Sequence, residues 1–333
     1  MNFCTLFDSY YLDKGITLYK SLEKVSKDFK LFIFCFDDKS KEVLLKENFE
    51  HAVILSHEDL EKEYDNLLEL KKQRSKAEYC WTCTPASIDY VLKHFDVDSC
   101  IYIDADLYFF ADPVYLENEI NEAKADIVIT PHRFTSSLKD KRFLRRSGKY
   151  CVEFNYFNKS DNAKEALNWW KEKCFEWCFH LYEPERMGDQ KYLEKFPVLF
   201  KGVHELKSLG GGVAPWNFAQ YTLKDKSNEH IYLKDKKSGE DFLLVFYHFQ
   251  DIRYLPGRKV NIKSNSHDKE MKYCVYKPYL KAIEETRRHL SDEYNIDFCP
   301  KKSYSSNKLI SFLQKNVLQY KVKSLSDIIS LDE

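Results

Sequence analysis

Two aspartates, one residue apart, stand at the end of a stretch that has the character of a buried strand. Asp104 and Asp106 follow the apolar run 101–103 and precede a second apolar run, 107–111. On a regular strand their Cβ atoms would lie about 7 Å apart, whereas two oxygens that bind one metal ion lie only about 3 Å apart. We therefore expect the strand to end here and the carboxylates to converge on Mg²⁺ or Mn²⁺, which would offset their repulsion.

The spacing of these aspartates is weak evidence by itself. Asp96 and Asp98 have the same spacing eight residues earlier, in an evident turn after the end of a helix. Two solvated carboxylates at a strand end are the alternative interpretation of Asp104 and Asp106. Context separates the two pairs, because ligands collect at the carboxyl ends of strands in open α/β sheets.

The elements around this pair alternate between strands and helices. Residues 3–7, 13–26 and 31–36 predict a strand, a helix and a parallel strand that is apolar on both faces. Further patterns predict a surface helix over 56–75, a helix from Thr84 and Pro85 to Phe95, a helix over 114–125, strands at 126–130 and 150–157, a helix over 163–179, a helix from Asp189, and a strand at 242–249. The stretch 132–149 holds seven Lys and Arg residues and predicts a loop over a site. This order is typical of an α/β fold.

Composition argues against several classes of protein. Lys and Arg (52) nearly balance Asp and Glu (53), which disfavours a nucleic-acid-binding protein. No run reaches 18 consecutive apolar residues, so we expect no membrane-spanning helix. Ten scattered cysteines and no recognisable signal peptide predict reduced thiols and a cytoplasmic location. Cys80 and Cys83 have the spacing of half a zinc site, but buried cysteines on a helix are the favoured interpretation.

The stretch IYIDADLYFFADP at 101–113 resembles the strand and aspartate motif of glycosyltransferases with the GT-A fold, especially the family-eight group that uses nucleoside diphosphate sugars. The opening TLFDSYYLDKGITLYKSL is similar to the first strand and helix of that family. Gly188-Asp189-Gln190 and Phe246-Tyr247-His248-Phe249 resemble two further motifs, and the pieces occur in the family's order over residues 3–256. The resemblance implies a GT-A, Rossmann-like mixed sheet flanked by helices, with a helical C-terminal extension.

The same resemblance implies roles for residues at the donor. His248 would join Asp104 and Asp106 as the third ligand of Mn²⁺ or Mg²⁺, although a core histidine is the simpler interpretation of His248 alone. Asp8 and Tyr11 would contact the base of the nucleotide, or else be an ordinary turn residue and an ordinary core residue.

At the sugar, Asp189 and Gln190 would be the catalytic residues, and Asn155 would face the sugar or the acceptor. Asp189 is equally suited to cap the helix that follows it. Arg253 stands beside the position of a family lysine and would hold the diphosphate, while Asp251 replaces the usual glycine.

We therefore expect a metal-dependent, retaining glycosyltransferase that moves a sugar from a nucleoside diphosphate sugar, a UDP-sugar in the first place, to a hydroxyl of a glycan or lipid-linked glycan. One alternative is a metal-dependent nucleotidyltransferase, which would favour a glycine-rich phosphate loop where FDSYYLDKG stands. Another is a catalytically weak nucleotide-sugar-binding protein on the same fold, suggested by the departures from the family pattern after His248.

We expect two parts of the chain, a transferase domain at 1–258 and a helical extension at 259–333. Near the end, Leu309, Leu313, Val317 and Tyr320 fall on one side of an expected helix that also carries several lysines. Such a helix packs on its own domain or lies on a membrane surface as a peripheral contact.

Overall fold

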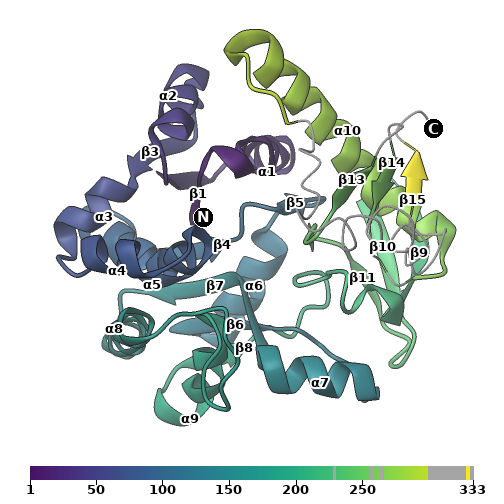
Figure 1. The fold of residues 1–333 in the computed structure, drawn as a ribbon. Coiled ribbons are helices and arrows are strands. Elements are labelled where there is room, and N and C mark those ends of the chain that lie inside the picture. Colours follow the sequence, from purple (N-terminus) through teal and green to yellow (C-terminus); the bar gives the residue numbers. More distant parts are fainter. Residues whose placement is uncertain (228–229, 256–258, 263, 265, 299–327, 331–333) are drawn as a thin grey trace, which may run out of the picture.

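A seven-stranded mixed sheet forms the centre of the molecule (Figure 1). The computed structural model describes residues 1–227, 230–255, 259–262, 264, 266–298 and 328–330. The strands of the sheet are β1 (Asn2–Phe7), β2 (Lys30–Cys35), β3 (Ala52–Ser56), β4 (Ser99–Ile103), β6 (Ile127–Pro131), β7 (Tyr150–Asn158) and β8 (Val203–Glu205). They stand in the order β3-β2-β1-β4-β7-β6-β8, and β7 runs antiparallel to both of its neighbours.

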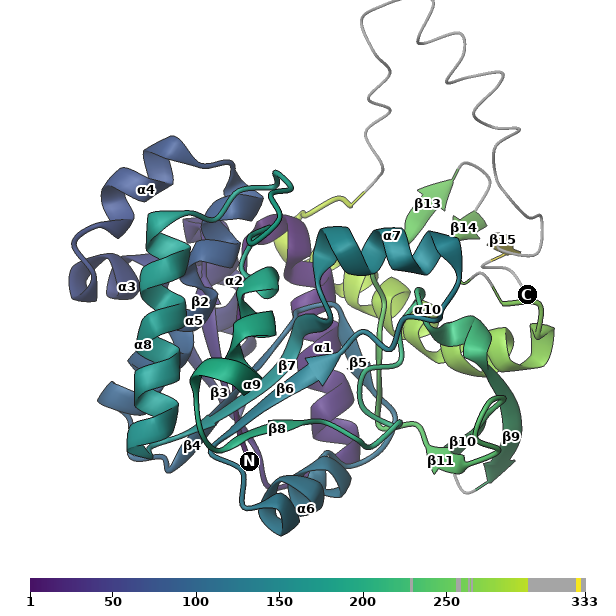
Figure 2. The ribbon, with the colours of Figure 1, turned by 90° about the horizontal axis from the view of Figure 1, so that it is seen from below.

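Helices cover both faces of this sheet (Figure 2). α5 (Lys76–His94) and α8 (Asp161–Glu176) lie on one face, and α1 (Leu12–Val25), α2 (Asp38–Glu47) and α6 (Val114–Ala123) lie on the other. In β1, Cys4 and Leu6 pack under α5, while Phe3 and Phe7 pack under α1, as the alternation of side chains along a strand requires. The remaining helices before residue 221 are α3 (His57–Glu63), α4 (Leu67–Gln73), α7 (Leu138–Ser147), α9 (Phe196–Leu199) and the 3₁₀ turns η1 (Ser9–Tyr11), η2 (Gln190–Lys195) and η3 (Phe218–Gln220).

A third apolar cluster builds the C-terminal part of the fold. Its elements are the pair β5 (Leu107–Phe109) and β12 (Phe246–His248), the sheet of β9 (Tyr221–Ser227), β10 (His230–Asp235) and β11 (Asp241–Leu243), the sheet of β13 (Arg253–Leu255), β14 (Lys259–Asn261) and β15 (Ile328–Ser330), and α10 (Lys269–Tyr294). α10 is joined to α1, because Arg287 Nε donates to Asp13 Oδ2 at 2.7 Å and Thr17 Oγ1 donates to Thr286 Oγ1 at 3.1 Å.

The expectation of a mixed α/β sheet flanked by helices is confirmed, but the predicted start of one helix at Thr84 and Pro85 is wrong. α5 begins at Lys76, because Ser75 and Glu78 form a capping box in which the Glu78 carboxylate accepts from Ser75 N at 2.9 Å. Pro85 lies inside the helix, where burial of the apolar face outweighs the loss of one backbone hydrogen bond.

The loop predicted over 132–149 is also wrong, since α7 occupies most of it. Ser137 caps this helix by accepting from Asp140 N at 3.1 Å, and the Asp140 carboxylate accepts from Thr135 N at 2.9 Å. The helix is basic and amphipathic, and Ser137 followed by Asp140 is a local signal for its start.

Two further predicted elements are each divided in two. The surface helix over 56–75 consists of α3 and α4, and the strand over 242–249 consists of β11 and β12 in different sheets. At the second break, Val245 N donates to Gly210 O at 2.9 Å and Val245 O accepts from Phe110 N at 2.8 Å. These bonds redirect the chain toward β5.

The predicted domain boundary at 258/259 and the predicted amphipathic helix around Leu309 to Tyr320 lie outside the described residues and stay predictions. On either side of that boundary, Phe249 and Val260 belong to one apolar cluster. Among the helices that the structure describes, none combines the length and the apolar character needed to cross a bilayer.

Candidate functional site

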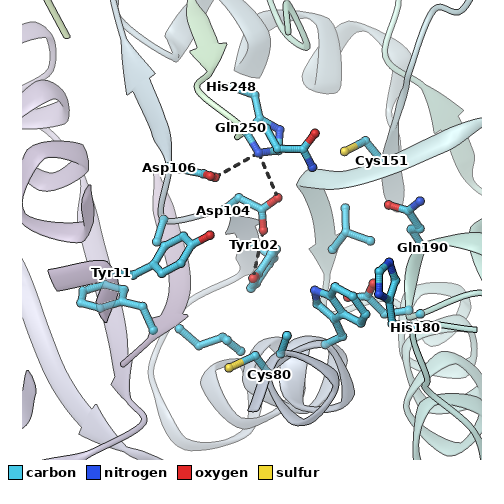
Figure 3. A pocket seen from close by; sticks show the side chains of 18 of the residues that line it. Tyr11, Cys80, Tyr102, Asp104, Asp106, Cys151, His180, Gln190, His248 and Gln250 are labelled. Carbon is cyan, nitrogen blue, oxygen red and sulfur yellow. Dashed lines mark hydrogen bonds and ion pairs between the residues drawn. The ribbon is translucent and has the colours of Figure 1, made fainter. Parts of the chain in front are cut away.

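A cavity of about 660 Å³ opens where β1, β4 and β12 end (Figure 3). Its volume lies within the usual range for small-molecule sites. Seven of the residues predicted from sequence line it: Asp8, Tyr11, Asp104, Asp106, Asp189, Gln190 and His248. Residues far apart in the chain thus meet at the carboxyl edge of the sheet, as expected for a ligand site in an open α/β fold.

The strand that carries the two aspartates ends just before them. β4 stops at Ile103, Asp104 to Asp106 form a turn, and Leu107 N donates to Asp104 O at 3.1 Å as β5 begins. The turn brings the carboxylates together on one imidazole: His248 Nε2 lies 3.0 Å from Asp106 Oδ1 and 3.7 Å from Asp104 Oδ2. The predicted convergence therefore occurs where the strand ends.

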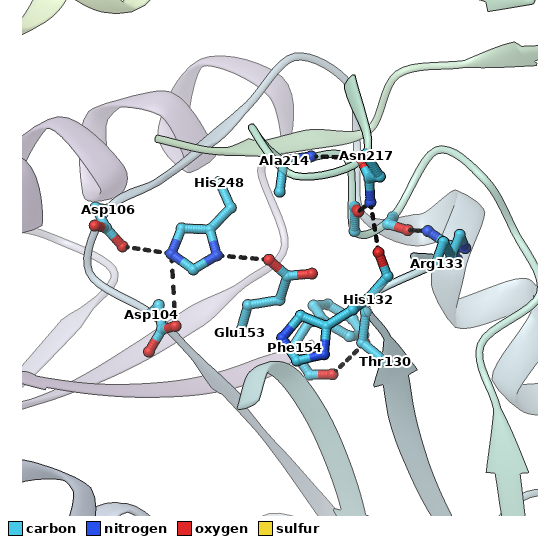
Figure 4. Close-up of polar contacts among 12 residues, drawn as sticks. Asp104, Asp106, Thr130, His132, Arg133, Glu153, Phe154, Ala214, Asn217 and His248 are labelled. Atoms are coloured by element: carbon cyan, nitrogen blue, oxygen red, sulfur yellow. Dashed lines mark hydrogen bonds and ion pairs between the residues drawn. The ribbon is translucent and has the colours of Figure 1, made fainter. Parts of the chain in front are cut away.

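His248 is placed by the pairing of β12 with β5, in which it stands opposite Leu107. Phe249 N also donates to Asp106 O at 2.9 Å, so the two strands hold the histidine and the aspartate in register. On the other side of the ring, His248 Nδ1 lies 2.6 Å from Glu153 Oε2 (Figure 4). The imidazole is therefore held between carboxylates on both of its nitrogens.

Burial and like charges set the electrostatics of this group. Burial raises the pKa of Asp104 to about 6, with His248 opposing and Asp106 reinforcing the shift. Burial also acts to raise the pKa of Asp106, but the attraction and hydrogen bond of His248 outweigh it and lower this pKa to about 2. Burial disfavours the charged form of His248, yet Asp106 and its hydrogen bond raise the pKa of His248 well above the usual value. A bound cation would therefore be favourable here, because it would offset the repulsion between the two buried carboxylates.

The donor atoms of Asp104, Asp106 and His248 lie within 4.8 Å of one another. Carboxylate oxygens with one imidazole nitrogen form a donor set that suits Mn²⁺ or Mg²⁺, so these residues fit the metal that the sequence predicted. Cys151, Glu153 and His248 form a second group of this size. Glu153 in that group does not line the cavity, so we treat it as a hydrogen-bond partner of His248 Nδ1 and not as a metal ligand.

Asp8 follows β1 and Tyr11 ends η1, and Figure 3 shows the Tyr11 ring across the cavity from Gln190. Asp8 caps η1 by accepting from Tyr10 N at 3.0 Å, and Lys76 Nζ lies 3.8 Å from its second oxygen. The Tyr11 ring is 42% exposed, and Lys14 Nζ lies 3.6 Å from its centroid. An exposed ring beside a carboxylate can stack on a flat ligand and accept hydrogen bonds from its edge.

Asp189 and Gln190 line the opposite wall. Asp189 makes no side-chain cap to η2, and burial together with the charge of Asp104 raises its pKa to about 7. Trp170 Nε1 fixes its backbone by donating to Asp189 O at 2.9 Å. Gln190 Nε2 donates to Ser147 O at 2.8 Å, which ties this wall to the end of α7.

Two predicted residues do not line the cavity. Asn155 is fully buried in β7 opposite Tyr102, and neither amide atom has a hydrogen-bond partner among the described residues. Arg253 is exposed, and its Nε donates to Asp251 Oδ1 at 2.9 Å. The roles given to them by the resemblance stay predictions.

Sequence reasoning missed Lys76 and Trp81 in the wall of the cavity, and Glu153 behind His248. Lys76 and Trp81 stand in the part of α5 that precedes the predicted start. Arg146, from the basic stretch for which sequence favours a solvated face over phosphate contact, also lines the cavity. Glu153 had a signal, since it is the one acidic residue in a strand of otherwise apolar, aromatic and amide side chains. The capping-box pattern of Ser75 and Glu78 was the sequence signal that α5 begins at Lys76.

The chain is similar in sequence to two curated proteins and similar in structure to a solved glycosyltransferase. No protein-family model matches. The chain is 30% identical over 320 residues to the Bacillus subtilis (strain 168) protein named Uncharacterized protein YfnD, covering 93% of this chain and 98% of that one. It is 31% identical over 301 residues to Uncharacterized protein YfnF of the same organism, covering 88% and 96%.

A solved structure of galactosyltransferase LgtC in complex with donor and acceptor sugar analogs is similar with a TM-score of 0.51 and 12% identity, covering 86% of this chain and 96% of that one. At this identity the likeness shows the fold. The GT-A fold predicted from the motifs is therefore confirmed.

Proposed function

We propose that this protein transfers a sugar. The chain belongs to the family of the Bacillus subtilis proteins YfnD and YfnF, and it has the GT-A fold. It would be a glycosyltransferase that moves a sugar from a nucleoside diphosphate sugar, first a UDP-sugar, to a hydroxyl. The observation that carries the proposal is the cavity at the carboxyl edge of the sheet, where Asp104, Asp106 and His248 converge and which Asp189 also lines. The two relatives carry no activity in their names, so the site supplies the argument.

The donor would lie across the cavity from Tyr11 to Asp189. Asp104, Asp106 and His248 would hold Mn²⁺ or Mg²⁺, which neutralises the negative charge that a departing diphosphate gains. Lys76 and Arg146 line the same cavity and would add positive charge near the phosphates. Tyr11 and Asp8 would stack on the base and accept its hydrogen bonds.

The sugar would face Asp189 and Gln190. As the bond to the diphosphate breaks, the anomeric carbon becomes electron-poor, and a buried carboxylate or amide oxygen beside it stabilises that charge. Gln190 is held by Ser147, and Asp189 is buried with its backbone fixed by Trp170, so both are preorganised. Retention of the anomeric configuration is part of the proposal and rests on the resemblance to family eight.

The acceptor would be a glycan or a lipid-linked glycan, and no nucleic acid takes part. We place the protein in the cytoplasm, a proposal supported by the nine free cysteines of the described residues. Peripheral contact with a membrane through the C-terminal segment around Leu309 to Tyr320 belongs to the same proposal, and that segment lies outside the described residues.

Thermal unfolding with a panel of nucleoside diphosphates and nucleotide sugars, each with and without Mn²⁺, tests this proposal. A ligand at about a hundred times its dissociation constant stabilises by about 2.7 kcal/mol, which gives a visible shift of the melting temperature. We expect a Mn²⁺-dependent shift with one nucleotide in the parent and none in Asp106→Asn. A shift that requires a nucleoside triphosphate would favour a nucleotidyltransferase, and no shift with any compound would contradict the proposal.

A further inference from the structure

We propose that Glu153 is a positioning residue that holds two of the three candidate metal ligands, His248 through its carboxylate and Asp104 through its backbone. The inference rests on the proposed function, since it concerns the metal site of that activity. It assigns a role to a residue that does not line the cavity.

The carboxylate of Glu153 selects which nitrogen of His248 faces the aspartates. A carboxylate accepts hydrogen bonds, so the 2.6 Å contact between Glu153 Oε2 and His248 Nδ1 keeps a ring proton on Nδ1, whether or not Nε2 is also protonated. Nε2 is then the nitrogen directed to Asp106 and Asp104, at 3.0 and 3.7 Å. A half-turn of the ring would replace that nitrogen by a carbon, and the bond to Glu153 opposes such a turn.

The backbone of Glu153 holds the other side of the site. Asp104 N donates to Glu153 O at 3.2 Å, which fixes the turn that follows β4. Asp106 is tied separately, by Phe249 N at 2.9 Å. One residue of β7 therefore contacts two ligands that come from different strands, and Figure 4 shows its side chain beside His248 on the face away from Asp106.

The contact with His248 does not satisfy the whole carboxylate of Glu153. Glu153 is fully buried, and its Oε1 atom has no hydrogen-bond partner among the described residues. Burying a charge with one oxygen unsatisfied costs free energy, and an apolar residue of similar size would avoid that cost. A carboxylate behind a metal-binding histidine is useful because it orients the ring and raises its basicity.

The experiment measures Mn²⁺ binding to the full chain by the electron paramagnetic resonance signal of free Mn²⁺, with and without UDP. The variants are Glu153→Ala, which removes the acceptor, and Glu153→Gln, which keeps an acceptor oxygen without the charge. Glu119→Gln is the matched control, because Glu119 Oε1 also bonds a histidine, His204 Nε2 at 2.7 Å, outside the cavity. Thermal unfolding of each protein reports whether it is folded.

We expect the Mn²⁺ dissociation constant to rise about 10- to 100-fold in Glu153→Ala, with Glu153→Gln between it and the parent. Glu119→Gln should bind Mn²⁺ like the parent, whatever its melting temperature. If Glu153→Ala does not fold, the comparison of Mn²⁺ affinity between Glu153→Gln and the parent decides whether the inference holds. Folded Glu153 variants with the parent's affinity would overturn this inference alone, whereas a parent that binds no Mn²⁺ with or without UDP would overturn the metal site of the proposed function as well.

Discussion

Asp104→Asn is expected to stabilise the metal-free protein while abolishing its response to Mn²⁺. Burial raises the pKa of Asp104 from 3.8 to about 6, so the charged form is about 3 kcal/mol less favourable in the folded state than in the unfolded state. Asparagine carries no charge, and it keeps the shape of the side chain. Because the Asp104 side chain is 30% exposed and water screens part of the effect, we expect a gain of about 1–2 kcal/mol at pH 8.

The gain should depend on pH with a defined sign. The folded-state pKa lies above the unfolded one, so the folded parent binds more protons between pH 3.8 and about 6. Its stability therefore falls as the pH rises through that window. The variant lacks this contribution, so its advantage should be complete at about pH 8 and vanish toward about pH 4.

The assay is thermal unfolding in EDTA at several pH values, repeated with Mn²⁺. For a chain of 333 residues, a gain of 1–2 kcal/mol corresponds to about 1.5–3 °C in melting temperature. Asp98→Asn is the control, because Asp98 belongs to a pair of the same spacing but is exposed, and it should change little. A less stable Asp104→Asn at pH 8 in EDTA would refute the reasoning, since it would mean that contacts such as the 3.2 Å bond from the Tyr102 hydroxyl outweigh the buried charge.

Three further substitutions have expected outcomes. Asp189→Asn should lower kcat by about a hundredfold with little change in nucleotide affinity, measured by steady-state kinetics, and an unchanged kcat would exclude Asp189 from the sugar site. Arg146→Ala should raise the donor KM about tenfold while Lys139→Ala, on the same helix but away from the cavity, should not, and equal effects would point to a general surface charge. Gly210→Ala should lower the free energy of unfolding by about 1–3 kcal/mol in urea, because its Cβ would collide with the carbonyl oxygen of Leu243, and a neutral result would show that this backbone can move.

The residues that sequence predicted well are those fixed by local chemistry. β4 ends at Ile103, where the chain turns through Asp104 to Asp106, and these aspartates lie where ligands collect. β1, α1 and β2 follow from apolar patterns that are continuous or have helical spacing. Motif order then placed His248 and Asp189 in the same cavity.

The residues that sequence reasoning missed depend on contacts between distant parts of the chain. Glu153 meets His248 across 95 positions, and no local pattern announces that pairing. The role predicted for Asn155 stays a prediction. β7, which carries both Glu153 and Asn155, pairs with β6 through a register shift between Val128 and Thr130, and no local pattern gives the position of such a shift.

Release of nucleoside diphosphate from a panel of nucleotide sugars, with Mn²⁺ and then with EDTA, tests the central claim most directly. Slow hydrolysis of the donor suffices for this measurement, so no acceptor has to be known. The account predicts that the parent releases diphosphate from at least one nucleotide sugar with Mn²⁺, and that EDTA or Asp106→Asn abolishes the release while the protein stays folded. No release from any donor by the parent, or equal release by Asp106→Asn, would contradict it.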